Sequence, residues 1–406
     1  VFGEQQYMDS WKITYFGQWV HQDGVRMLNS TSNLEVKNLE FEGNKDEIWN
    51  SLASSHGYQV SSARHELPEE YHVTRRFLEK CPKLLAVSVN GAGYDTVDVQ
   101  ACSDRGIIVV NQAGANREAV AEHVLGMMLA LSKRIVEMDR SLRRERGWHR
   151  NDYMGTELLG KTIGIIGLGN VGSRVSELCG GLFQMSVCAY DPYLSEEEIE
   201  VRGAVPVDLG KLLESSDFVS VNCPLTTETT GMIDGAAIAQ MKRESHLITT
   251  ARGGIVDEGA LINALEKGSL RGAGIDVWED EPPPLDHKLI NFDNVILTMH
   301  TAGITEEDIT FTASDLVHVT FDGFRLNSSD YARNNAANSI SLPSALFVPA
   351  EAPWMVTVEV EKYHDGNLVQ KWHYATSSSP STKALVNGCP VDAILGAAKL
   401  MHTVIV

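Results

Sequence analysis

The sequence has few cysteines and few basic residues, and each shortage excludes a class of protein. Six cysteines stand among 406 residues and no two form a CxxC pair, so neither a zinc site nor a disulfide framework is indicated. The 34 Lys and Arg residues are outnumbered by 54 Asp and Glu, which gives a formal net charge of -20. This charge repels phosphate backbones and anionic lipid, so we expect no nucleic-acid or membrane partner.

Long apolar runs are also missing. No stretch approaches the roughly 18 consecutive apolar residues of a membrane-spanning helix. The run at 124–131 is soon followed by Lys133 and Arg134. Since no basic segment followed by an apolar run opens the sequence, we predict no signal peptide and expect a cytoplasmic protein with reduced thiols. The remaining composition, 43% hydrophobic and 22% charged, is ordinary for a globular protein, and this length predicts two or three domains.

Short apolar runs alternate with helical patterns in the first part of the chain, which predicts a parallel sheet. The runs cover residues 12–17, 58–62, 83–89 and 106–111. Residues 118–138 form the longest helical pattern. Its apolar side chains share one stripe: Val120, Val124, Met127, Met128 and Leu131.

The second part of the chain predicts a second parallel sheet. Its six candidate strands are 161–166, 185–190, 218–222, 246–250, 272–277 and 294–299. They are near-continuous apolar runs, as expected when helices cover both faces of a sheet. The pattern weakens after residue 304, where we expect 312–324 to form one returning helix. The tail, 331–406, contains a strand-like run at 354–363 and is otherwise unassigned.

A glycine motif, GLGNVG, lies directly after the first strand of this second sheet and opens an apolar helix over 171–183. In such a turn Gly167 permits the tight bend, Gly169 lets the backbone approach a pyrophosphate, and Gly172 lets helix and strand pack closely. An ordinary glycine-rich turn is the alternative. Asp191 ends the next strand, 19 residues after Gly172, where a carboxylate binds the adenosine ribose hydroxyls. A carboxylate there repels a 2'-phosphate, so the pattern predicts NAD rather than NADP.

Ligands of open α/β sheets collect at the carboxyl ends of the strands. The residues at those ends are Gly167, Asp191, Cys223 with Pro224, Arg252, Asp276 and His300. Arg252 can grip a carboxylate through two hydrogen bonds, and His300 can exchange a proton near neutral pH. Glu281, in a proline-rich loop, can pair with an imidazole. Alone, each has a plainer interpretation: Arg252 could form a structural ion pair, His300 could be a core histidine, and Glu281 could lie in a solvated acidic loop. Together they predict hydride transfer between nicotinamide and an alcohol of an organic acid.

These residues together resemble the D-isomer-specific 2-hydroxyacid dehydrogenases. The resemblance runs from about Leu84 to Gly303. Its motifs cover residues 91–98, 118–130, 160–172, 223–231, 249–261, 273–283 and 299–303, in the order in which the family has them.

The resemblance implies roles for individual residues. Arg252 would bind the substrate carboxylate, His300 would be the acid/base, and Glu281 would be its partner. The loop at Ala92 and Gly93 would hold the substrate carboxylate through backbone amides. The implied cofactor positions are Gly167, Gly169, Asn170, Val171, Gly172, Asp191, Cys223, Pro224, Ala251, Asp276, His300 and Gly303.

The resemblance also implies a two-lobed α/β architecture with the active site between the lobes. A flavodoxin-like substrate domain would span 1–117 and be completed by a returning helix within 302–330, and a Rossmann NAD-binding domain would span 118–301. The family commonly forms dimers through the NAD lobe, so the basic segment 140–149 would lie at that contact. The tail departs from the family and lacks the βαββαβ rhythm of a regulatory domain, so no regulation by it is predicted.

Two other functions share this fold. Formate dehydrogenases are suggested by Asn116, His123 and the sequence CPL, but they carry Gln where Glu281 stands, and formate has no alcohol to deprotonate. NAD(H)-sensing corepressors keep the Arg, Glu and His, so the sequence leaves that alternative open. Substrate identity is open too: Arg64 could meet a phosphate or second carboxylate, and hydroxypyruvate, glyoxylate, 3-phosphohydroxypyruvate and larger 2-oxoacids all remain candidates.

Overall fold

The computed structural model describes residues 11–17, 28–29, 34–144 and 149–305, and between 317 and 405 the backbone of short strand segments. The chain divides into two compact units, Asn116–Ile304 and the rest. The domain division that we predicted, with 1–117 completed by 302–330, then 118–301 and a tail 331–406, stays a prediction.

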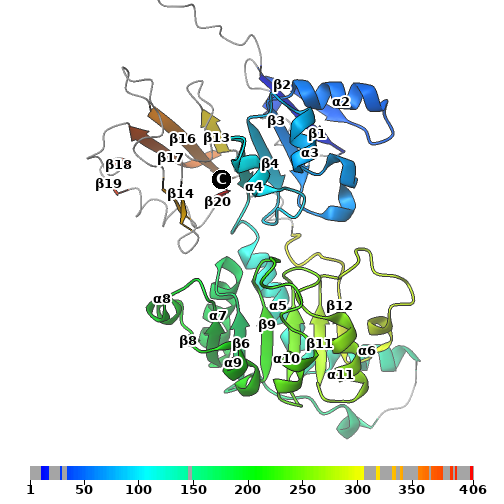
Figure 1. Ribbon diagram of the computed structural model, residues 1–406. Helices are drawn as coiled ribbons and strands as arrows, with labels where there is room; N and C mark the ends of the chain where they lie inside the picture. Colours follow the sequence, from blue (N-terminus) through cyan, green and yellow to red (C-terminus); the bar gives the residue numbers. More distant parts are fainter. Residues whose placement is uncertain are drawn as a thin grey trace, which may run out of the picture. The chain divides into compact units, whose positions relative to one another are not determined.

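The first unit contains a parallel sheet in the order β2-β1-β3-β4-β5 (Figure 1). This is the flavodoxin-like strand order that the resemblance implied. A short strand from the end of the chain, β20, pairs antiparallel with β5 at the edge. The strands are β1 (Trp11–Phe16), β2 (Leu34–Leu39), β3 (Gly57–Ser61), β4 (Ala86–Asn90), β5 (Ile108–Asn111) and β20 (Thr403–Ile405). β2 and β20 had no counterpart among the four predicted runs.

The three α-helices of this unit begin at polar capping residues. Asn44, Thr74 and Asp98 each accept a hydrogen bond from a backbone N–H in the first turn that follows, which satisfies donors that helix geometry leaves unpaired. The helices are α2 (Lys45–Ser54), α3 (Arg75–Lys80), α4 (Val99–Ser103), η1 (Arg64–Glu66) and η2 (Glu69–Tyr71). Buried rings, among them Tyr58 and Phe77 stacked at 5.2 Å, form much of the core against the sheet.

The second unit contains a seven-stranded parallel sheet in the order β12-β11-β10-β9-β6-β7-β8. This is the doubly wound Rossmann order with an additional strand at one edge, so the predicted fold class is confirmed. The chain reverses its direction of sheet growth between β6 and β9, where open α/β sheets bind their ligands. The strands are β6 (Thr162–Ile166), β7 (Ser186–Tyr190), β8 (Val205–Pro206), β9 (Phe218–Val221), β10 (His246–Thr249), β11 (Gly272–Ile275) and β12 (Val295–Leu297).

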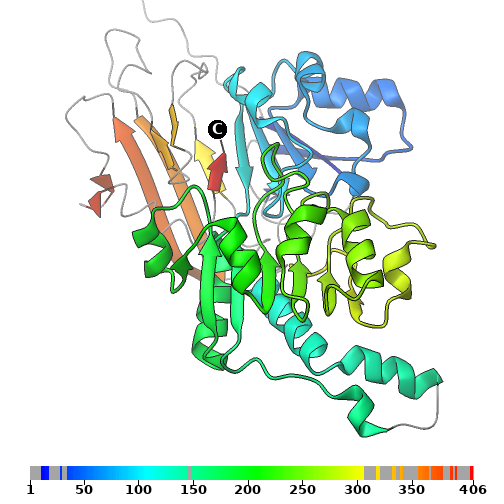
Figure 2. The same ribbon diagram turned by 60° about the horizontal axis from the view of Figure 1, so that its bottom comes forward.

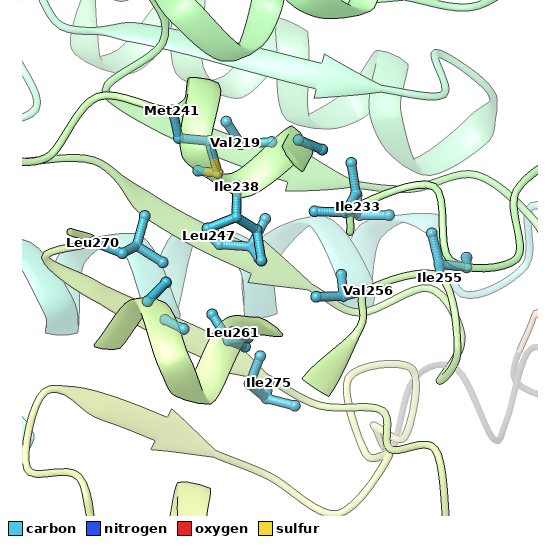
Figure 3. Packing of buried hydrophobic residues seen from close by; sticks show 14 of the residues in the cluster. Val219, Ile233, Ile238, Met241, Leu247, Ile255, Val256, Leu261, Leu270 and Ile275 are labelled. Atoms are coloured by element: carbon cyan, nitrogen blue, oxygen red, sulfur yellow. The ribbon is translucent and has the colours of Figure 1, made fainter. Parts of the chain in front are cut away.

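Helices cover both faces of this sheet, as its apolar strands predicted. One buried cluster joins the sheet to α9 (Leu209–Ser215), α10 (Gly235–Gln240) and α11 (Glu258–Glu266) (Figure 3). A second cluster joins it to α5 (Arg117–Ser132), α7 (Asn170–Phe183) and α8 (Glu196–Val201). Each fully buried Leu or Ile stabilises the fold by about 1.5–3 kcal/mol. This packing holds in place the strands whose ends carry the site residues.

The helix predicted over 118–138 is two helices. Its apolar stripe is buried as expected, but α5 ends at Ser132 and α6 (Ile135–Arg144) starts a new direction (Figure 2). Arg134 lies between them with a φ of 54°, the left-handed region. Its guanidinium donates to Glu137 and to the carbonyl of Asp152, which holds this break in place. The 3-10 helices η3 (Arg150–Tyr153) and η4 (Lys288–Asn291) complete the unit.

Beyond residue 305 the structure describes strands. The predicted returning helix is wrong for Val317–Thr320, which form β13 and pair antiparallel with β16. Two of these four residues are Val and one is Thr, types that favour strands. The predicted strand at 354–363 is confirmed as part of β16. These strands are β13, β16 (Met355–His364) and β17 (Asn367–Ser377) in one sheet, β14 (Ala332–Asn334) with β15 (Ser339–Ser341), and β18 (Leu385–Val386) with β19 (Cys389–Pro390).

Across the described part of the chain, no helix combines the length and apolar character that a membrane crossing requires.

Candidate active site

Two of the three glycines of GLGNVG have a steric reason to be glycine, and the third borders open space. Gly167 has a φ of 86°, and a Cβ there would lie 2.8 Å from the backbone nitrogen of Cys223. A Cβ on Gly172 would lie 2.1 Å from the carbonyl oxygen of Gly167, so only glycine lets α7 pack on this turn. A Cβ on Gly169 would have no atom within 4 Å. Gly169 therefore borders open space, which suits a turn that a ligand approaches.

The helix that follows offers backbone donors to that space. α7 begins at Asn170, and its N-cap is Gly169, which has no side chain to cap the first turn. Helix geometry leaves the first N–H groups, those of Asn170, Val171 and Gly172, without acceptors inside the helix. The helix dipole adds a partial positive charge at this end. These residues therefore fit the pyrophosphate of a dinucleotide.

Asp191 is fixed beside the same turn. One carboxylate oxygen accepts a hydrogen bond from the N–H of Leu168 at 2.9 Å, and the other accepts one from the N–H of Tyr193 at 3.1 Å. Each oxygen keeps a second lone pair, and the residue is half-buried. The carboxylate is thus oriented in advance and can accept hydrogen bonds from the two hydroxyls of a ribose.

Cys223 and Pro224 follow β9, directly across the turn from Asp191. Burial raises the pKa of the Cys223 thiol to about 11, so it remains protonated at neutral pH. Pro224 is exposed, and its carbonyl accepts a hydrogen bond from the hydroxyl of Thr229 at 2.7 Å. The predicted cofactor residues on β6, β7 and β9 therefore lie together at the point where the sheet order reverses.

His300 and Glu281 form a pair. His300 Nδ1 lies 2.9 Å from Oε2 of Glu281, and the two side chains are 28% and 19% exposed. Because the carboxylate only accepts, Nδ1 carries the hydrogen and donates it, which leaves Nε2 of His300 for a substrate. His300 has a φ of 55°, an uncommon backbone conformation for a histidine and one that is frequent at functional sites.

Asp276 holds the turn that carries His300. Its fully buried carboxylate accepts from the N–H groups of Thr301 and Ala302 at 2.9 and 3.0 Å, and from the hydroxyl of Thr298 at 2.6 Å. The N–H of His300 donates to the carbonyl of Asp276 at 2.7 Å. The contacts of Asp276 are therefore those of a residue that orients His300. The cofactor contact implied for it by the resemblance stays a prediction.

Gly303 ends the same turn. A Cβ on Gly303 would lie 2.6 Å from the side-chain nitrogen of Asn116, so any other residue would have to displace that side chain. Asn116 is the residue before α5, so this packing ties the turn to the start of that helix.

Trp278 links Glu281 to the strand before His300, a role that was not predicted from the sequence. Its indole N–H donates to the carbonyl of Thr298 at 3.0 Å, and its backbone N–H donates to Oε1 of Glu281 at 3.2 Å. The tryptophan is 5% exposed, so both bonds are shielded from water. Its position inside a predicted site motif was the one available signal.

Arg252 lies on the neighbouring strand end. Its Nη1 donates to the carbonyl of Ala251 at 2.7 Å, and both residues are half-buried. A Cβ on Gly253 would lie 1.6 Å from the carbonyl oxygen of Trp278, so the Arg252 loop presses directly on the loop that carries Glu281. Thr250, just before, has a buried hydroxyl without a hydrogen-bond partner in the described part of the structure. Such a group is one that a ligand or a water normally satisfies.

Arg252, Glu281 and His300 therefore follow β10, β11 and β12, three adjacent strands of one sheet. The structure brings the predicted catalytic residues to one edge, together with the glycine turn. Within the described residues, no three His, Cys, Asp or Glu side chains are grouped so that they could hold a metal ion.

The predicted substrate loop, with Ala92 and Gly93, belongs to the first unit and follows β4. Asn111 donates to the carbonyl of Ala92 at 2.6 Å, and the side chain of Gln112 accepts from the N–H of Gly91 at 2.7 Å. Gly91 has a φ of 104°, which favours glycine. The loop is thus held in a defined shape at the carboxyl end of its sheet.

Arg64 lies near that loop within the first unit. It is exposed in η1, just after β3, the strand next to β4. The hydroxyl of Thr96 donates to the carbonyl of Ser61 at 2.6 Å, which joins the loops that follow these two strands.

Comparison with known proteins places the chain in a family. Residues 125–302 match the family profile described as D-isomer specific 2-hydroxyacid dehydrogenase, NAD binding domain. The chain is 43% identical over 235 residues to D-3-phosphoglycerate dehydrogenase of Archaeoglobus fulgidus, covering 58% of this chain and 44% of that protein. It is 40% identical over 232 residues to glyoxylate reductase of Korarchaeum cryptofilum, covering 56% of this chain and 70% of that protein.

A solved structure gives the same result. The crystal structure of D-lactate dehydrogenase from Aquifex aeolicus complexed with NAD and lactic acid matches with a TM-score of 0.65 and 28% identity, over 74% of this chain and 92% of that one. The chain spans about half the length of the phosphoglycerate dehydrogenases that it matches, between 44% and 53%. The sequence, the fold and these relatives agree: the chain belongs to the D-isomer-specific 2-hydroxyacid dehydrogenase family and carries its NAD-binding domain.

Proposed function

We propose that the protein is an NAD-dependent oxidoreductase that interconverts a D-2-hydroxyacid and its 2-oxoacid. The observation that carries the proposal is the pair of His300 and Glu281, 2.9 Å apart at the carboxyl edge of an NAD-binding sheet. An alcohol that loses a hydride must also lose a proton, and this pair supplies an acid/base for that proton.

The chemistry of each residue follows from its contacts. NADH, when bound, supplies the hydride that the carbonyl carbon of the 2-oxoacid accepts. Nε2 of protonated His300 gives its proton to the carbonyl oxygen, and in the reverse direction it takes the proton from the hydroxyl. Glu281 stabilises the imidazolium through Nδ1 and fixes the orientation of the ring. Arg252 has a charge that does not titrate and a planar fork that binds the substrate carboxylate.

Cofactor preference follows from the charge of Asp191. The carboxylate is held by two backbone N–H groups, so it cannot easily turn away from the ribose. A 2'-phosphate would meet this negative charge, whereas ribose hydroxyls would donate to it. We therefore propose NAD over NADP, with Gly167 to Gly172 at the pyrophosphate and with Cys223, Pro224, Ala251, Asp276 and Gly303 as further cofactor contacts.

The substrate contacts in the first unit are part of the proposal. Ala92 and Gly93 would bind the substrate carboxylate through backbone amides, and Arg64 would recognise a phosphate or a second carboxylate. The candidates remain hydroxypyruvate, glyoxylate, 3-phosphohydroxypyruvate and larger 2-oxoacids. An unchanged ranking of these substrates in Arg64→Ala would remove Arg64 from the specificity site.

We also propose a cytoplasmic homodimer joined through the second unit. The support is an exposed apolar surface around α6, where Ile135, Leu142 and Met154 are 52%, 55% and 68% exposed. Residues 140–144 of α6 and His149 are the described part of the predicted basic contact; residues 145–148, which include Trp148, lie outside the described residues. A molar mass of one chain by light scattering at micromolar concentration would contradict the dimer.

The test is NADH oxidation, followed by absorbance, with hydroxypyruvate, glyoxylate, pyruvate, 3-phosphohydroxypyruvate and an aromatic 2-oxoacid, repeated with NADPH. We expect clear turnover of at least one 2-oxoacid with NADH. No turnover across the panel, with NADH binding intact, would overturn the enzyme assignment and favour an NAD-sensing binding protein. NAD reduction by formate at a comparable rate would favour the formate dehydrogenase alternative.

A further inference from the structure

The loop that carries Glu281 is fastened to the start of α11. We define the Glu281 loop as residues 278–287. Glu258, the first residue of α11, and Glu279 in the loop exchange hydrogen bonds: the N–H of Glu258 donates to a carboxylate oxygen of Glu279 at 3.2 Å, and the N–H of Glu279 donates to Oε1 of Glu258 at 2.8 Å. This reciprocal contact fixes the loop two residues before Glu281.

The other end of the Glu281 loop reaches the same carboxylate. His287 Nε2 lies 2.9 Å from Oε2 of Glu258, and the two side chains are only 16% and 12% exposed. The N–H of Leu289 donates to Nδ1 of His287 at 3.3 Å, so Nδ1 carries no hydrogen and Nε2 is the donor to Glu258. The imidazole also packs edge-on against the ring of Trp278, with centroids 5.4 Å apart.

Glu258 therefore ties together the residues on both sides of Glu281. One of its oxygens holds Glu279 and the other holds His287, while Trp278 fixes Glu281 Oε1 from within the loop. None of Glu258, Glu279 and His287 is hydrogen-bonded to His300, so their effect on His300 is indirect. It passes through Glu281 or through Trp278, which contacts His287 and donates to the carbonyl of Thr298. The pairing of Glu281 with His300 needs hydrogen-bond geometry, which a loop that shifts by an ångström would lose.

We propose that Glu258 and His287 are positioning residues that hold the Glu281 loop, and thereby hold Glu281 against Nδ1 of His300. The catalytic consequence rests on the proposed function; the consequence for the loop does not.

The experiment uses the full chain and three single variants. His287→Leu removes the bond to Glu258 and keeps an apolar side chain beside Trp278. His287→Gln keeps an Nε2 donor and is the conservative variant. Lys288→Gln is the matched control, because it removes only the exposed ion pair of the next residue with Glu266, at 3.2 Å. If His287→Leu fails to fold, Glu258→Gln replaces it.

Turnover should separate positioning from a general structural role. We expect His287→Leu to lower kcat about 10- to 100-fold with little change in the Kd of NADH, while Lys288→Gln stays normal and His287→Gln recovers most of the loss. Added to Glu281→Gln, His287→Leu should cause almost no further loss, because the residue it positions is already disabled. A normal kcat in His287→Leu, or losses that multiply in the double variant, would overturn the proposal.

Hydrogen exchange gives a readout that needs no turnover. We expect amides of the Glu281 loop to exchange about tenfold faster in His287→Leu than in Lys288→Gln, with other peptides unchanged. Equal exchange would overturn the inference even if the enzyme is active. An unmutated protein that reduces no 2-oxoacid would refute the proposed function, and exchange would still decide this inference.

Discussion

Gly253→Ala tests the contact between the Arg252 loop and the Glu281 loop. A Cβ at this position would lie 1.6 Å from the carbonyl oxygen of Trp278, where real contacts stay beyond 3.0 Å. The added Cβ is fixed to the backbone of residue 253 and the oxygen belongs to the backbone of Trp278. No side-chain rotation can therefore relieve the contact, and one loop must move by about 1.4 Å. A misplacement of about 1 Å in a catalytic group lowers the rate about 100-fold. Overpacking of this kind also destabilises a fold by about 1–3 kcal/mol.

The assay for Gly253→Ala is kcat/KM for reduction of the best 2-oxoacid, together with thermal unfolding. We expect kcat/KM to fall about 100-fold or more in protein that is still folded at the assay temperature. The control is Gly181→Ala, on α7, where a Cβ meets nothing within 4 Å and where alanine should stabilise the helix by up to about 1 kcal/mol. A Gly253→Ala protein with normal kinetics and normal stability would refute the steric argument.

Three further predictions concern charge. Glu281→Gln replaces the carboxylate that accepts from Nδ1 of His300 with a neutral amide, so the reduction rate should fall, and an unchanged rate would contradict the pairing. Asp191→Ala removes a repulsion between two negative charges of at least about 1.4 kcal/mol, so the ratio of kcat/KM with NADPH to kcat/KM with NADH should rise about tenfold or more. Equal use of both cofactors by the unmutated protein would refute the cofactor preference. Burial, aided by the positive Arg271, lowers the pKa of His246 to about 4 from 6.5. The neutral form therefore stabilises the fold above about pH 6.5, and this contribution is lost as the pH falls toward 4. His246→Phe keeps the stacking on Phe218 and removes the group that titrates. When the pH falls from about 7.5 to 4.5, the free energy of unfolding should therefore drop by roughly 2–3 kcal/mol less in the variant than in the unmutated protein. Urea titrations at both pH values measure this difference.

Most of the second sheet could be predicted because strands such as β9, β10 and β11 are buried on both faces. Runs such as 161–166 and 218–222 are mostly apolar, and this pattern depends on burial alone. β2, at an edge, was missed because half of the residues of Leu34–Leu39 are charged or polar and half are exposed. β8 has only two residues, too few to form a pattern.

Breaks and pairings that depend on distant contacts could not be predicted. The periodicity of 118–138 is helical on both sides of Arg134, and the break there depends on a bond to the carbonyl of Asp152, 18 residues away. The strand at Val317–Thr320 depends on a partner, β16, about 40 residues further along the chain.

The candidate site was predictable in its chemistry but less so in its support. His300, Glu281 and Arg252 were identifiable because proton transfer and carboxylate binding require those residue types at strand ends. Trp278 and Glu258 were missed because positioning requires only a hydrogen bond at the right place, which many residue types can supply. Gly253 is the exception, because its contact with Trp278 leaves no room for any other residue.

The central claim is that His300 exchanges the substrate proton while the glycine turn and Asp191 hold the cofactor. The most direct measurement is single-turnover reduction of the best 2-oxoacid by His300→Ala, beside a titration of NADH binding. The account predicts a rate lower by a factor of about 10² to 10⁴ with an unchanged Kd for NADH. A near-normal rate in His300→Ala would contradict the claim.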